Sequence, residues 1–284
     1  MNIWGSILEL FGWGSPAPPP PAPPQWQLGG VFDGKTVVVG AGPNYGGAIY
    51  SLLWGGNQLI NQDPANGGQL QTAYHVETPP GQQNAINPTE AGNWLDHVSS
   101  KGSPTGSTTQ MTGEYLSSVH LQTLCHPAYW SGAYQGSLVS PDVLGKTVTL
   151  VGNDIHLEYT LAFNSDHPSC GLETCWYLPL NFTAWYDSET GVQVSISPKT
   201  SANADRPMIA ATADGSPACA IFSKAPNKVF GWGYDQQYPK INIYFPNLGV
   251  ITKGQKFAWE AFAVFGTLAQ VQATLKALDT AAVA

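Results

Sequence analysis

IHLEYTLAF, residues 155–163, alternates apolar and polar side chains along almost its whole length. In an extended strand every second side chain lies on the same face, so Ile155, Leu157 and Leu161 share one face while His156 and Glu158 share the other. A helix would instead repeat its apolar positions every three or four residues. The stretch therefore predicts a half-buried β-strand.

Similar strands are expected on both sides of this one, at intervals of roughly ten to twenty residues. They span residues 36–39, 48–54, 58–60, 69–76, 115–125, 147–150, 182–186, 192–197, 240–245 and 257–264. Strands this close together leave little room for crossover helices, which favours an antiparallel β-sandwich over repeated βαβ units. Within the series, Gly55, Gly56 and Asn57 predict a hairpin turn between 48–54 and 58–60.

One helix is expected to close the chain. Thr267 and Gln270 have the spacing of a capping box, in which each side chain bonds the other residue's backbone amide. The apolar stripe behind this start consists of Leu268, Val271, Leu275 and Leu278.

The first 25 residues differ in composition from the rest. Residues 1–14 form an apolar segment with helical spacing, residues 15–25 are a proline-rich linker, and residues 26–284 are expected to form a single β-sandwich domain. Because so short a helix is marginal alone, it is expected to dock either on its own domain or on a protein partner that residues 1–13 bind. The segment lacks the basic start of a secretory signal, so the compartment stays open, an extracellular, surface or virion location included.

Charged residues are sparse in this chain. They make up 11% of the 284 residues, the net charge is −8, and lysine and arginine form no cluster. Nucleic acids and anionic membrane surfaces are bound through basic patches, so neither partner is expected. No stretch approaches the roughly 20 apolar residues of a spanning helix, so no membrane span is expected either.

The four cysteines are Cys125, Cys170, Cys175 and Cys219. The close spacing of Cys170 and Cys175 predicts a small disulfide loop, with free buried thiols as the alternative. A zinc site would need a second close pair, so no metal is predicted. The chain also lacks the motifs of phosphate-binding loops, serine hydrolases and zinc proteases, and no cofactor is predicted.

NYGGAIYSLLW, residues 44–54, resembles the opening of a family of mostly uncharacterised β-sandwich proteins. Further similar segments are GQLQTA (68–73), NPTEAG (87–92), AYW (128–130) and FGTL (265–268). The resemblance covers about residues 28–280, and the family is similar in outline to the galactose-mutarotase-like supersandwich, whose members bind, cleave or epimerise sugars. Gly68 stands where the family pattern has an arginine, which removes an anion-binding group and weighs against an acidic sugar.

The fold class expected from the pattern and the resemblance together is all-β. It is an antiparallel, supersandwich-like β-sandwich with a C-terminal helix and a short N-terminal helix on a proline-rich tether. The resemblance implies a carbohydrate partner.

Three predicted strands carry histidine on the face opposite their apolar side chains. These faces hold Gln71 with His75, His120 with His126, and His156 with Glu158. If the strands are neighbours, they form one polar wall, and neutral polar groups beside aromatic rings suit a sugar. The expected substrate-binding residues are Gln71, Trp54, Trp94, Trp130, His120 and Glu158. The alternative is a polar sheet face that simply meets water.

The long segment 77–113 adds groups suited to proton transfer. An imidazole titrates near neutral pH and a carboxylate can orient it, so the expected catalytic residues are Glu90, His97, His126 and His75. Solvated loop charges are the alternative for Glu90 and His97. The sequence thus predicts a carbohydrate-binding or carbohydrate-active protein, such as a sugar epimerase, lyase or hydrolase. The second hypothesis is a structural or adhesive module of a virion or surface assembly, anchored through its N-terminal segment.

Overall fold

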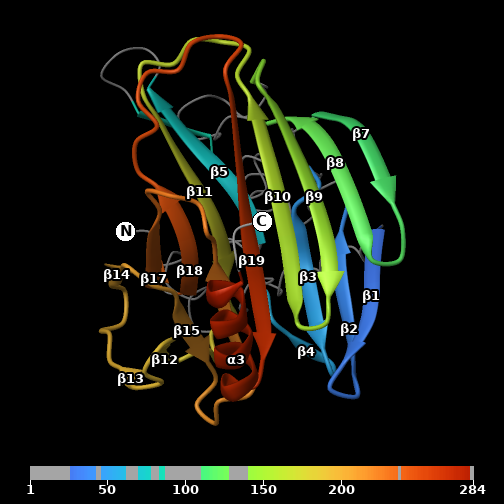
Figure 1. The fold of residues 1–284 in the computed structure, drawn as a ribbon, viewed down its shortest axis with the longest axis vertical. Coiled ribbons are helices and arrows are strands. Elements are labelled where there is room, and N and C mark those ends of the chain that lie inside the picture. The colour runs from blue at the N-terminus through green and yellow to red at the C-terminus, as the bar shows by residue number, and fades with distance from the viewer. Residues whose placement is uncertain are drawn as a thin grey trace, which may run out of the picture.

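Two large antiparallel β-sheets make up most of the computed structural model (Figure 1). The structure describes residues 26–42, 46–61, 70–77, 83–86, 110–127, 140–235 and 238–281. Within them it has the expected all-β sandwich with a C-terminal helix. The predicted N-terminal helix and proline-rich linker lie outside the described residues, so the division into segments 1–14, 15–25 and 26–284 stays a prediction.

Sheet A contains ten of the described strands. Its main path is β1 (Trp26–Phe32), β2 (Lys35–Ala41), β3 (Ile49–Trp54), β5 (Leu70–Glu77), β11 (Cys170–Tyr177), β18 (Tyr238–Phe245), β17 (Val229–Asp235) and β14 (Ser201–Ala204), while β4 (Asn57–Gln58) pairs with β3 and β6 (Gln83–Ile86) with β5. The predicted hairpin joins β3 to β4. It turns through Gly55 and Gly56, whose φ angles of 57° and 82° are left-handed and favour glycine.

Sheet B contains nine described strands and faces the viewer in Figure 1. Its order is β13 (Gln193–Val194), β12 (Ala184–Asp187), β15 (Met208–Ala211), β16 (Ala218–Phe222), β19 (Lys256–Gly266), β10 (Asp154–Ala162), β9 (Val143–Val151), β8 (His120–His126) and β7 (Gln110–Leu116). Consecutive strands such as β9 and β10 pair as antiparallel neighbours, as the short spacing predicts.

The helix α3 (Leu268–Thr280) contacts β16 and β19 of sheet B and buries Val271 and Leu275. Figure 1 shows the helix beside β19. The predicted capping box is confirmed. The backbone N–H of Gln270 donates to Thr267 Oγ1, and the backbone N–H of Thr267 donates to the side-chain oxygen Oε1 of Gln270. In the part of the chain that the structure describes, no helix combines the length and the apolar character needed to cross a bilayer.

The core lies between the two sheets and is built as the alternation predicts. The apolar positions of β10 are buried and its polar positions lie on the outer face. Tyr159, one of the buried set, stacks on Trp259 of β19 with ring centroids 4.9 Å apart. Trp259 Nε1 in turn donates to Thr174 Oγ1 of β11 at 3.0 Å. A hydrogen bond inside the core therefore joins sheet B to sheet A.

The strand β11 is not predicted by the sequence pattern, because all eight of its residues are buried and no polar alternation marks it.

The strand β11 also contains both cysteines of the predicted disulfide. That prediction is wrong, since no disulfide joins Cys170 and Cys175. They lie five residues apart in one extended strand, which places them on opposite faces and about 17 Å apart. Cys125 and Cys219 are buried and form no disulfide either.

Candidate functional site

The structure divides the predicted polar wall between the two outer faces of the sandwich. Gln71 and His75 lie on β5 of sheet A, on the face opposite the core residue Tyr74. His120 and Glu158 lie on β8 and β10, on the outer face of sheet B. Because the inner faces of the two sheets pack together, their outer faces point apart. The prediction of one shared wall is therefore wrong, and these two pairs of residues cannot contact one small ligand.

Two other predicted site residues have structural contacts. His126 Nδ1 lies 2.9 Å from the backbone oxygen of Asp142. Trp54 is fully buried, and Lys35 Nζ stands 3.9 Å from the centroid of its ring. Trp54 therefore cannot stack on a sugar, contrary to the prediction. The predicted residues Glu90, Trp94, His97 and Trp130 lie outside the described residues.

A compact polar cluster on the outer face of sheet A centres on Glu173 of β11. Glu173 Oε1 accepts hydrogen bonds from Lys240 Nζ at 2.5 Å and from Asn242 Nδ2 at 2.9 Å. Its other oxygen, Oε2, lies 3.5 Å from His75 Nε2. The strands β5 and β18 flank β11, and Tyr244 stands directly opposite Glu173. We call Glu173, His75, Lys240, Asn242 and Tyr244 the Glu173 cluster.

The charges of the Glu173 cluster are largely withdrawn from water. The exposed fractions of the side chains are 8% for Glu173, 15% for Lys240 and 26% for His75. Burial by itself would raise the pKa of Glu173, but the charge of Lys240 and the hydrogen bonds from His75 and Lys240 outweigh it and hold this pKa at about 2. Although burial disfavours the charged form of Lys240, the nearby Glu173 carboxylate keeps the pKa of the lysine well above its usual range. The two residues thus form a permanent ion pair at neutral pH.

Aromatic side chains surround this ion pair. The rings of His75 and Tyr244 meet edge to face with centroids 6.4 Å apart. Lys240 Nζ lies 5.2 Å from the ring centroid of Tyr177, which packs edge to face on Tyr238 at 5.4 Å. Burial, followed by the Glu173 charge, raises the pKa of Tyr244, so its hydroxyl stays a hydrogen-bond donor at neutral pH. The cluster therefore offers donors and acceptors beside the half-buried ring of Tyr244, whereas the rings of Tyr177 and Tyr238 are buried and, like that of Trp54, cannot stack on a sugar.

Sequence analysis identifies His75 as a site residue but none of its partners in the cluster. Glu173 lies in β11, where no alternation draws attention to it. The segment KINIYF, residues 240–245, does carry a signal, since Lys240, Asn242 and Tyr244 occupy alternate positions and share one face. The pairing of this strand with β11 connects distant parts of the chain and is not encoded in any local pattern.

A second polar network, buried in the core, joins Asp142, His167 and Ser165. Asp142 Oδ2 and Ser165 Oγ both contact Nε2 of His167, at 2.8 and 3.1 Å. A catalytic serine–histidine–aspartate arrangement needs its two partners on different ring nitrogens, so this network is structural. Among the described residues, no three histidine, cysteine or acidic side chains are grouped to hold a metal ion.

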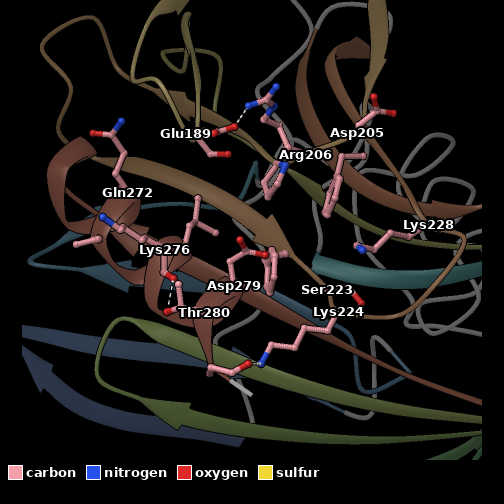
Figure 2. A pocket seen from close by; sticks show the side chains of 17 residues that line it. Glu189, Asp205, Arg206, Ser223, Lys224, Lys228, Gln272, Lys276, Asp279 and Thr280 are labelled. Atoms are coloured by element: carbon pink, nitrogen blue, oxygen red, sulfur yellow. Dashed lines mark hydrogen bonds and ion pairs between the residues drawn. The ribbon is translucent and has the colours of Figure 1, made fainter. Parts of the chain in front are cut away.

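A groove of about 900 Å³ lies beside α3, which supplies one of its walls (Figure 2). Three of its charged side chains, Glu189, Arg206 and Lys224, bond groups of the groove itself. Arg206 bonds Glu189, and Lys224 Nζ donates to the carbonyl of Ala281 at 2.9 Å. Arg206 and Glu189 are exposed, and exposed ion pairs contribute little energy. The Glu173 cluster is the stronger candidate, because desolvated charges with a shifted pKa are typical of functional sites.

Comparison with protein-family models and with curated protein sequences finds no match for this chain. Solved structures do match. The Slr1438 protein of Synechocystis sp. PCC 6803 is 12% identical, with a TM-score of 0.50 over 87% of this chain and 98% of that protein. At such low identity the likeness shows the fold alone.

Two further structures are similar at lower TM-scores. A presumed aldose 1-epimerase from Escherichia coli K12 is 8% identical, with a TM-score of 0.48 over 85% of this chain and 99% of that one. A 4-alpha-glucanotransferase from Thermococcus litoralis is 12% identical, with a TM-score of 0.47 over 85% of this chain and 37% of that one. Among these matches, the one with the Slr1438 protein supports the fold of the chain, an antiparallel β-sandwich.

Proposed function

We propose that this chain binds a carbohydrate at the Glu173 cluster and that His75 exchanges protons with the bound sugar. The observation that carries the proposal is the ion pair of Glu173 and Lys240, which is almost withdrawn from water on an outer sheet face. Desolvating two charges costs several kcal/mol each, which only close attraction and further hydrogen bonds offset. Packing alone does not require such a pair there, and this supports a functional role.

The chemistry of the cluster suits a neutral sugar. The charges of Glu173 and Lys240 cancel locally, while the Asn242 amide, the His75 imidazole and the Tyr244 hydroxyl supply hydrogen-bonding groups. Sugar hydroxyls need paired donors and acceptors, and the apolar face of a sugar ring packs on aromatic side chains. The family that residues 28–280 resemble implies the same class of ligand.

Among sugar reactions, epimerisation at the anomeric carbon fits the cluster best. It needs a proton removed from the anomeric hydroxyl and a proton delivered to the ring oxygen, and His75 can carry these protons while ionised Glu173 orients its ring. Hydrolysis commonly uses two carboxylates, whereas the described side chains that contact the Glu173 carboxylate are Lys240, His75 and Asn242, none of which is a carboxylate. Elimination on an acidic sugar would need a free cation, and Glu173 already holds Lys240.

The test combines a glycan array with polarimetry of freshly dissolved aldoses. The wild type should bind a neutral glycan and accelerate mutarotation, and His75→Ala should slow the catalysed rate by a factor of about 100 or more, the usual contribution of one acid–base group. His156→Ala is the matched control. Its Nε2 lies 3.1 Å from Glu260 and its side chain is 27% exposed, but it stands on the outer face of sheet B.

Equal losses in the two histidine variants, or no loss in His75→Ala, would contradict the catalytic proposal. Binding without any acceleration would leave a carbohydrate-binding module that lacks catalysis. No binding on the array and no acceleration would remove the proposal altogether.

A further inference from the structure

A hollow of about 240 Å³ adjoins the Glu173 cluster on the outer face of sheet A. It lies over β17, between β18 and β14, the last strand of the path. Lys240 and Asn242 line the hollow and also bond Glu173, so the hollow is continuous with the cluster. Ser201 and Asn203 of β14 line its far side.

The hollow exists because β17 presents glycine where neighbouring strands present side chains. The strand register places Gly231 between Asn242 and Asn203. The floor here is therefore main chain, and the walls on its two sides carry amide groups. Asn203 is exposed, which leaves its amide accessible to a ligand.

Gly231 also fixes the position of the Asn242 side chain. A Cβ atom on Gly231 would overlap Asn242 Oδ1 and stand 2.8 Å from its Cγ. The amide of Asn242 therefore lies directly over Gly231, while its Nδ2 donates to Glu173 Oε1 at 2.9 Å. Gly231 is a positioning residue that couples the hollow to the ion pair.

We propose that the Glu173 cluster and the hollow over Gly231 form one groove for a neutral oligosaccharide chain. One sugar unit would occupy the cluster and a further unit would lie over β17, between Asn242 and Asn203. This inference rests on the proposed function. Neighbouring strands stand about 4.8 Å apart, so the path from β11 to β14 spans about 14 Å, which is longer than one sugar ring.

The hollow also selects against a charged chain. Among the described residues that line it, Lys240 is the charged one, and Glu173 neutralises it. The amides of Asn203 and Asn242 and the hydroxyl of Ser201 both donate and accept, as neutral sugar hydroxyls require.

The test is calorimetric titration with a series of neutral linear oligosaccharides, from the monosaccharide to the hexasaccharide, of the sugar that binds best. Affinity should rise with the second and third units and then level off. Asn203→Ala should weaken binding of the longer chains about tenfold, the effect of one lost hydrogen bond, and leave the monosaccharide unaffected. Gln122→Ala is the matched amide control, since Gln122 is exposed on β8 of sheet B.

Gly231→Ala gives a second, different signature. The new methyl group displaces the Asn242 amide from Glu173, so binding of every length should weaken about tenfold. A thermal melt verifies that each variant is folded, and Ser201→Ala replaces Asn203→Ala if that variant does not fold.

The outcomes separate the two proposals. If the monosaccharide binds but affinity does not change with length, or if Asn203→Ala and Gln122→Ala behave alike, the oligosaccharide groove is wrong and the proposed function stands. If no sugar of any length binds, the proposed function fails and the groove fails with it.

Discussion

The carboxylate of Glu173 makes the stability of this protein sensitive to acid. Its pKa is about 2 in the folded state against an ordinary value of 4.5. The unfolded chain therefore binds the proton more tightly, so the stabilisation is complete above pH 4.5 and is lost as the pH falls towards about 2. We expect about 3 kcal/mol of the free energy of unfolding to disappear across this window, measured by urea denaturation at a series of pH values.

Glu173→Gln is the control for this pH dependence. Its amide cannot titrate, so its free energy of unfolding should lack this part of the decline with acid. The variant should be less stable at neutral pH, because Lys240 loses the charge that it pairs with. If the free energy of unfolding fell with acid equally in the variant and the wild type, Glu173 would not be an ionised residue paired with Lys240.

The cysteines provide another test at the residue scale. All four thiols are buried and outside any disulfide, and burial raises the pKa of Cys170 to about 12. A thiol reagent should therefore modify none of them in the native protein and all four after denaturation without reductant. If two thiols stayed unreactive until reductant was added, the chain would contain the disulfide that the spacing of Cys170 and Cys175 predicts.

Local patterns in the sequence identify some site residues and misplace others for physical reasons. His75 could be found because a polar side chain on an alternating strand has to leave the core. Trp54 is misassigned because a tryptophan ring can pack in a hydrophobic core or stack on a sugar. The residue type alone does not show which of these two roles applies. Glu173 is missed because its partners lie on β5 and β18, which are distant from β11 in the sequence.

At the scale of elements, the start of α3 is fixed by its capping box. Thr267→Ala removes the acceptor for the Gln270 amide, and we expect it to lower the free energy of unfolding by about 1 kcal/mol. Thr280→Ala, at the exposed end of the same helix, should change it by no more than about 0.5 kcal/mol. Chemical denaturation of both variants measures the difference, and equal effects would mean that the box does not stabilise the helix.

The strands differ in how readily the sequence predicts them. β10 has one buried and one outer face, so its alternation is complete. β11 is buried on both faces, and burial on both sides removes the polar positions that mark a strand. The element that carries the centre of the candidate site is thus one that periodicity cannot detect, whereas the capping box and the β3–β4 hairpin, which depend on neighbouring residues, are predicted correctly.

For the whole molecule, the assignment of strands to sheets decides which polar side chains can contact the same ligand. The alternation places His75 and His156 on polar faces, but it does not indicate that their strands belong to different sheets. Strand pairing over a hundred residues depends on the complete core, which the local pattern does not specify. The sandwich therefore has two histidine–glutamate pairs that face in opposite directions, and the pair on sheet A is the one proposed to bind a ligand.

Mapping backbone amide shifts by nuclear magnetic resonance during a sugar titration tests this assignment most directly. A neutral sugar selected on the glycan array should shift amides of β5, β11, β17 and β18 around Glu173 and leave those of β8, β9 and β10 unchanged. Shifts concentrated on the outer face of sheet B, or in the groove beside α3, would contradict the assignment of the site to the Glu173 cluster.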